Sequence, residues 1–135
     1  MDREAFDRLV ADALQSIPRG FRDAMANVVI VVEDEPSRRL LREMAIEPPD
    51  TLLGLYQGTP LPQRQWDYGN TLPDRILIFQ GPHERHARTE DDLINAIAET
   101  LIHEIGHYFG MNEEQIQEIE EHYWRKSRKK GRESS

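Results

Sequence analysis

Residues 100–114, TLIHEIGHYFGMNEE, hold two of the five histidines in the chain, four positions apart, with a glutamate directly after the first. Side chains four residues apart on an α-helix lie one turn above each other, so His103 and His107 can face one metal ion. Glu104 is next to His103 and could accept a proton from a water molecule at that ion. The pattern predicts a zinc site suited to hydrolysis. The alternative is a solvated helix face that happens to carry two histidines.

The two histidines belong to a long amphipathic helix that we predict over residues 90–109. At 100° per residue, one half of this helix is apolar and must pack on the rest of the fold. The apolar half consists of Leu93, Ile94, Ile97, Ala98, Leu101, Ile102, Ile105, Tyr108 and Phe109. His103 and His107 fall on the opposite half, which they share with the small residues Ala96 and Thr100. The histidines are therefore expected at a surface with free space beside them, not in the core.

A catalytic zinc ion needs a third protein ligand and a position left for water. Gly110 follows the helix and can adopt the left-handed conformation that ends a helix and reverses the chain. Such a reversal could bring Glu113 back to an ion held by His103 and His107. We therefore predict Glu113 as the third ligand. Glu114, a water molecule or a loop histidine remain alternatives, because acidic residues also favour the first turn of a helix for electrostatic reasons.

The composition is that of one acidic, folded domain. The chain has 135 residues, a net charge of −8 and no cysteine, which excludes thiolate metal sites and disulfides. We predict a single domain over residues 1–124 and a basic, solvated and disordered tail over residues 125–135. The acidic body argues against nucleic acid as the main partner, although the tail could touch RNA, lipid or an acidic protein. No apolar run approaches the ~20 residues of a membrane span, and the acidic N-terminus is unlike a secretory signal, so we expect a cytoplasmic protein.

The remaining patterns predict an α+β domain with a small sheet. Helices are expected at 3–17, 19–26, 36–44 and 112–126, the last with a capping box of Asn112 and Gln115, and strands at 27–34, 51–58 and 74–81. The β-branched strand 27–34 should be buried on both faces. Segment 74–80 is the expected edge strand for an extended peptide. The polar segment 81–92 is expected to be a loop.

Four stretches resemble the small bacterial zincin-like metallopeptidases. They occur in the family's order and are NVVIVVED at 27–34, LLGLYQGTPL at 52–61, LPDRILIF at 72–79 and HEIGHYFGMNEE at 103–114. The resemblance implies an α+β domain whose small mixed sheet packs against the zinc-binding helix. It also implies His103, His107 and the residue at 113 as zinc ligands, with Glu104 as the general base. The family usually has Asp where this chain has Glu113.

We therefore predict a zinc-dependent peptidase that acts on peptides or unfolded protein. A zinc-containing binding or regulatory module with little turnover is the alternative, because a chain this compact has little material for specificity pockets. Tyr68, Arg75, His83 and His86 lie in or near segments that could border the cleft. Each is more often a surface or strand-end residue, and none is included in the predicted catalytic set.

Overall fold

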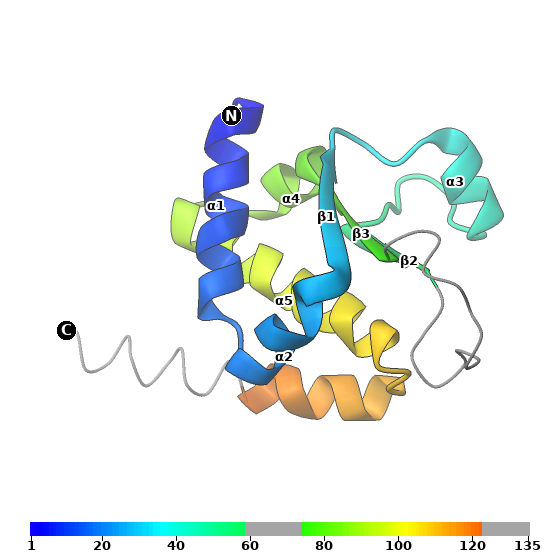
Figure 1. The fold of residues 1–135 in the computed structure, drawn as a ribbon. Helices are drawn as coiled ribbons and strands as arrows, with labels where there is room; N and C mark the ends of the chain where they lie inside the picture. The colour runs from blue at the N-terminus through cyan, green and yellow to red at the C-terminus, as the bar shows by residue number, and fades with distance from the viewer. Residues whose placement is uncertain (59–73, 123–135) are drawn as a thin grey trace.

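The computed structural model describes residues 1–58 and 74–122, which form an α+β fold around a three-stranded mixed sheet (Figure 1). The strand order is β1 (Val28–Glu33), β3 (Asp74–Phe79) and β2 (Gly54–Gln57). Strand β3 pairs with β1 in parallel and with β2 in antiparallel orientation. The helices are α1 (Arg3–Ser16), α2 (Arg19–Ala24), a short 3-10 turn (Met25–Asn27), α3 (Arg38–Glu43), α4 (Gln80–His86), α5 (Glu90–Tyr108) and a helix over residues 113–122.

The core lies where α1 and α5 meet each other and the sheet. Of the predicted apolar half of α5, only Ile94 and Phe109 are half-buried, and the other members are buried. They pack with Phe6 and Ala13 of α1 and with Ile76 and Ile78 of β3. The predicted fold class, with a small mixed sheet against the histidine-bearing helix, is thus confirmed.

The order of the strands differs from the prediction. Strand β3 lies in the centre of the sheet, so the expectation that segment 74–80 is an edge strand is wrong. The edges are β1 and β2. Strand β1 is not buried on both faces either, because Val29 is 45% exposed. A β-branched run shows that a strand forms, but its position in the sheet depends on tertiary pairing that no local pattern records.

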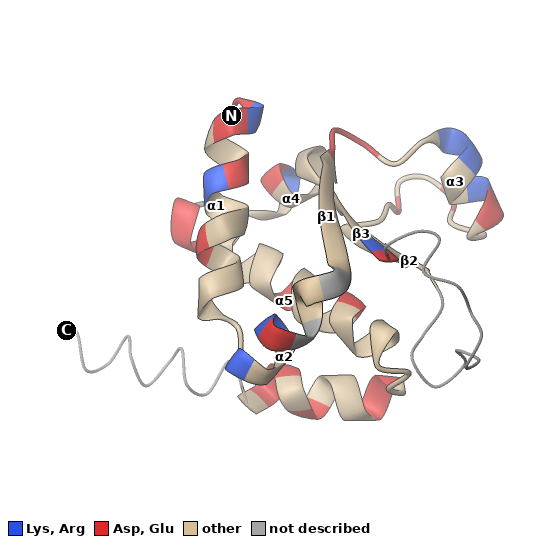
Figure 2. Ribbon diagram, viewed as in Figure 1, with Lys and Arg blue, Asp and Glu red and all other residues tan. Residues whose placement is uncertain are grey.

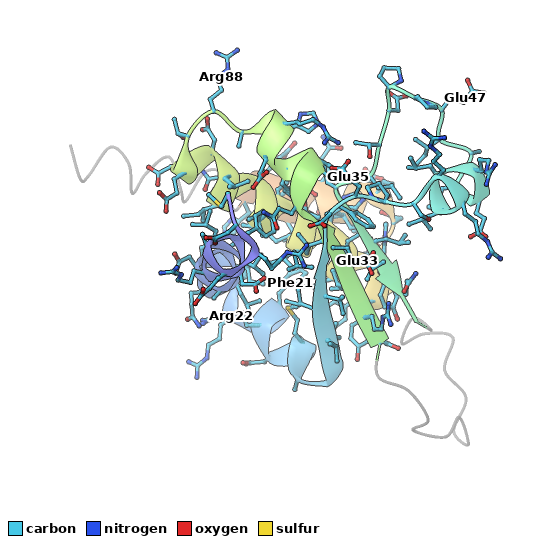
Figure 3. All side chains as sticks on the ribbon, turned by 90° about the horizontal axis from the view of Figure 1, so that it is seen from above. Phe21, Arg22, Glu33, Glu35, Glu47 and Arg88 are labelled. Carbon is cyan, nitrogen blue, oxygen red and sulfur yellow. The ribbon has the colours of Figure 1, made fainter. Side chains whose placement is uncertain are left out.

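The segment predicted as a polar loop contains helix α4, which follows β3 without a connecting loop. Pro82 is compatible with this helix because it stands in the first turn, where a missing N–H is tolerated. The helix turns His83 into the core, where its side chain is fully buried. Arg88 lies just after α4 and points away from the body of the molecule, as does Glu47 beyond α3 (Figure 3).

The distribution of charged residues reflects the net negative charge of the sequence. Acidic residues recur along α1, at the start of α5 and along the helix 113–122 (Figure 2). In residues 1–58 and 74–122, no helix combines the length and the apolar character needed to cross a membrane. The predicted basic tail and Tyr68 lie outside the described residues.

Candidate metal centre

Helix α5 presents His103 and His107 side by side on its half-exposed face. The Thr89 hydroxyl caps the helix by accepting from the Asp92 N–H at 3.0 Å. Because α5 continues without a break to Tyr108, the two rings stay one turn apart, with centroids separated by 4.9 Å. Neither ring is buried, since their side chains are 34% and 38% exposed. Two imidazoles at this spacing can bind a common ion.

The chain reverses directly after α5, as the glycine in the sequence predicts. Gly110 has a φ of 72°, in the left-handed region. Its N–H donates to the His107 carbonyl at 3.0 Å, and the Met111 N–H donates to the Gly106 carbonyl at 2.9 Å. This pair of bonds is a Schellman motif, which ends the helix and turns the chain back. Asn112 then begins the predicted capping box.

Both bonds of the capping box are present. The Asn112 N–H donates to the Gln115 side-chain oxygen at 3.0 Å, and the Gln115 N–H donates to the Asn112 side chain at 2.8 Å. The helix 113–122 starts at this cap and lies alongside α5 (Figure 1). The direction of the new helix is therefore fixed within four residues of the end of α5.

The two helices approach each other closely at Gly106. A Cβ atom added to Gly106 would lie 2.5 Å from Cγ1 of Ile116, a distance that real Cβ contacts do not reach. Ile116 is buried against this glycine. Residues 113, 116 and 120 share one face of the second helix, because they are spaced by three and four positions. The face that packs on α5 thus carries Glu113 and Glu120 back to the histidines.

Glu113 faces both imidazoles. Its Oε1 atom lies 3.4 Å from Nε2 of His107 and 3.6 Å from Nε2 of His103. Tetrahedral zinc with ligand distances of about 2.0–2.1 Å separates two of its donor atoms by about 3.3–3.4 Å. The two distances from Glu113 Oε1 to the imidazole Nε2 atoms are thus close to this separation. Glu114, the alternative third ligand in the sequence, is exposed on the same helix turn.

The other ring nitrogens face two further carboxylates. His103 Nδ1 lies 3.2 Å from Oε1 of Glu120, whose side chain is 18% exposed. His107 Nδ1 lies 3.4 Å from Oε1 of Glu104. His103, Glu104 and His107 form a compact group of potential metal donors. However, the same Glu104 oxygen accepts the Tyr56 N–H at 2.8 Å, so this atom is already engaged.

Glu104 is held between α5 and the edge strand β2. Its side chain is buried, with 6% of the residue exposed. Strand β2 approaches α5 closely at Gly54, where an added Cβ would lie 2.6 Å from the Thr100 methyl group and 2.9 Å from the Leu77 carbonyl oxygen. The bond from Tyr56 orients the carboxylate, because the backbone N–H donates to one of its two oxygens.

A cavity of about 410 Å³ opens beside His103. Residues 51–54 form one wall and α5 from Ala96 to Glu104 forms the other, with Glu120 at the side. Ala96 and Thr100 line this cavity, as the small size of their side chains predicts. Burial raises the pKa of the Glu99 carboxyl in the cavity, and the neighbouring Glu120 charge raises it further.

Of the candidates outside the predicted catalytic set, His83 has a structural role. Its Nδ1 lies 2.8 Å from the Phe79 carbonyl and its Nε2 lies 3.0 Å from the Thr100 hydroxyl, which also contacts the Ala96 carbonyl. It therefore ties the end of β3 to α5 and is not a loop histidine that could serve as the third metal ligand. His86 and Arg75 are exposed.

Glu120 and the anchoring of Glu104 by β2 are the features that the sequence interpretation missed. The spacing of residues 113, 116 and 120 around an apolar isoleucine could have indicated that Glu120 faces α5. The contact between Glu104 and Tyr56 joins residues 48 positions apart and leaves no local pattern.

A short mixed sheet, a helix that carries H-E-x-x-H on its open face and a glycine turn that returns a glutamate to the histidines define a zincin-type domain. The zincin-like metallopeptidase family matches residues 25–123, so the chain belongs to this family. A conserved hypothetical protein from Thermo thermophilus is similar in structure, with a TM-score of 0.53 and 24% identity over 81% of this chain and 94% of that protein. This likeness concerns the fold alone. No curated protein matches the chain.

Proposed function

We propose that the protein is a zinc-dependent peptidase in which His103, His107 and Glu113 hold the metal ion and Glu104 is the general base. The observation that carries this proposal is the convergence of both Nε2 atoms on one Glu113 oxygen, at 3.4 and 3.6 Å. Glu113 suits the role better than Glu104, because the Glu104 oxygen near His107 faces Nδ1 and already accepts the Tyr56 N–H.

The donor set fits zinc. Two imidazole nitrogens and one carboxylate oxygen are ligands that catalytic zinc sites use, and the chain has no thiolate that would favour a closed structural site. The half-exposed rings leave room for a fourth ligand from solvent. When bound, zinc lowers the pKa of water to about 7 and polarises a carbonyl group.

Glu104 supplies the proton transfers. Its carboxylate stands beside His107 and is fixed at one oxygen by the backbone of β2, so the side chain does not need to reorganise during the reaction. It accepts a proton from the attacking water and delivers that proton to the amine of the leaving peptide.

Strand β2 offers the edge along which an extended peptide would bind. Its one edge pairs with β3, and its other edge faces Glu104 through the Tyr56 N–H. Peptides commonly add to such edges through main-chain hydrogen bonds. The cavity beside His103 would take one substrate side chain, because it lies between β2 and α5.

Hydrolysis of a fluorogenic peptide library by wild-type protein and by Glu104→Gln tests the proposal. We expect the variant to lose about 10²- to 10⁴-fold in kcat/KM at saturating zinc, since the proton acceptor is removed while His103, His107 and Glu113 remain. Glu121→Gln, an exposed change on the helix 113–122, should keep wild-type activity.

Two results would contradict the peptidase function. If the zinc-loaded wild-type protein and Glu104→Gln are equally inactive on every library, the protein is a zinc-containing binding or regulatory module. If the variant is as active as the wild type, another group is the base.

A further inference from the structure

We infer that Glu120 is a positioning residue that orients the His103 ring for metal binding, an inference that rests on the proposed zinc site. Glu120 is 13 residues beyond His107 and belongs to a different helix from His103. Its Oε1 atom lies 3.2 Å from Nδ1 of His103, whereas Nε2 of the same ring faces Glu113 at 3.6 Å. The two ring nitrogens thus have separate partners.

The chemistry follows from the tautomers of imidazole. A neutral ring carries one proton, and only the nitrogen without it can donate a lone pair to a metal ion. A carboxylate accepts hydrogen bonds but cannot donate them, so Glu120 draws the proton to Nδ1. Nε2 is then free on the side where His107 and Glu113 converge. The bond also restricts rotation of the ring before the ion arrives.

The packing of the helices explains why Glu120 can hold this position. Ile116 is inserted against Gly106, and Glu120 lies one turn further along the same face. Its side chain is mostly shielded, at 18% exposed, while neighbouring Glu118 and Glu121 are exposed. Partial burial strengthens the hydrogen bond, because less water competes for the carboxylate.

The Nδ1 atom of His107 faces a different carboxylate, so the effect of Glu120 on His103 can be measured separately. The carboxylate near Nδ1 of His107 is Glu104, at 3.4 Å, and it comes from the same helix. Loss of Glu120 would therefore affect one of the two imidazoles. Partners of this kind typically change metal affinity by about 10- to 100-fold, far less than loss of a ligand.

Zinc titration of Glu120→Ala, Glu120→Gln and Glu118→Gln tests the inference through affinity rather than activity. We expect about 10- to 100-fold weaker zinc binding for Glu120→Ala. Glu120→Gln should recover part of that loss, because its amide oxygen can still accept from Nδ1. Glu118→Gln removes the same charge from the exposed side of the helix and should bind zinc as the wild type does.

The tautomer of His103 is read separately, in metal-free protein labelled with ¹⁵N-histidine at pH 8, with His103→Gln used to assign the resonance. We expect the proton on Nδ1 in the wild type and a shift toward the Nε2–H form in Glu120→Ala. Urea unfolding of each variant verifies that the fold is retained.

Unchanged zinc affinity and an unchanged His103 tautomer in Glu120→Ala would overturn the inference. Zinc loss as complete as in His103→Ala would also overturn it, since Glu120 would then be a ligand. If the wild-type protein binds no zinc, the proposed function fails, whereas the tautomer in metal-free protein still reports on the contact between Glu120 and His103.

Discussion

At the scale of single residues, each histidine is defined by the atoms that its two nitrogens face. His103 and His107 turn Nε2 toward Glu113 and Nδ1 toward other carboxylates. His83, by contrast, is enclosed in the core, with a carbonyl oxygen at Nδ1 and a hydroxyl group at Nε2. A neutral ring can donate from Nδ1 to the carbonyl and accept at Nε2 the one Thr100 hydroxyl proton, which the Ala96 carbonyl otherwise receives. Histidine is thus a half-exposed potential metal donor on α5 and a buried hydrogen-bonding group on α4.

His83 should make the fold less stable in mild acid. Burial lowers its pKa below the ordinary value of 6.5. The unfolded chain therefore binds more protons than the folded chain between those two pKa values, so the free energy of unfolding decreases as the pH falls through 6.5. One such group contributes a slope of at most about 1.4 kcal/mol per pH unit. Urea unfolding of metal-free protein between pH 7.5 and 5.5 measures it.

The comparison that isolates His83 uses two variants. His83→Gln should flatten the pH dependence in this range, whatever its effect on stability at pH 7.5. His122→Gln, which changes an exposed histidine on the helix 113–122, should keep the wild-type slope. Equal slopes in all three proteins would mean that His83 does not remain neutral in the fold. The difference between variants cancels other groups such as Glu99, whose raised pKa acts in the opposite direction.

At the scale of elements, the site depends on how closely the helix 113–122 packs on α5. The turn at Gly110 sets the direction, and the contact of Gly106 with Ile116 sets the distance. Glu113 and Glu120 stand on either side of Ile116, so a small displacement of the second helix would move both carboxylates away from the histidines together. A glycine within the histidine motif is therefore required by helix packing rather than by backbone conformation.

Gly106→Ala should destabilise the fold and weaken zinc binding. Alanine gains about 1 kcal/mol of helix propensity over glycine, but the overpacking at 2.5 Å from Ile116 typically costs about 1–3 kcal/mol. We expect a net loss in the free energy of unfolding, measured in urea. Adding Ile116→Ala should remove the clash, so the double variant should be more stable than the sum of the two single effects predicts. Strictly additive effects would contradict the close contact.

Local patterns predicted much of this fold and missed what tertiary contacts decide. The period of α5, the turn at Gly110 and the capping box depend on neighbouring residues, so they could be predicted. The central position of β3, the exposure of Val29 and the formation of α4 depend on which strands and helices meet. For the site, the histidine spacing and the return of Glu113 were accessible to sequence reasoning. Glu120 was not recognised, because its partner lies on another helix.

At the scale of the whole molecule, the proposed ion would join two helices that belong to different parts of the fold. His103 and His107 belong to α5, which packs on the sheet and on α1, while Glu113 belongs to the helix that follows the turn. Strand β2 joins the same site through the Tyr56 N–H on Glu104. Sheet, central helix and returning helix thus meet at one place, which is consistent with membership of the zincin-like metallopeptidase family.

In the proposed metal centre, His103, His107 and Glu113 hold one zinc ion. Diffraction from zinc-soaked crystals on both sides of the zinc absorption edge tests it directly. We expect one anomalous peak about 2.0–2.2 Å from both Nε2 atoms and from a Glu113 carboxylate oxygen. A peak with Glu114, Glu120 or Glu104 in place of Glu113, or no peak between the two imidazoles at saturating zinc, would contradict it.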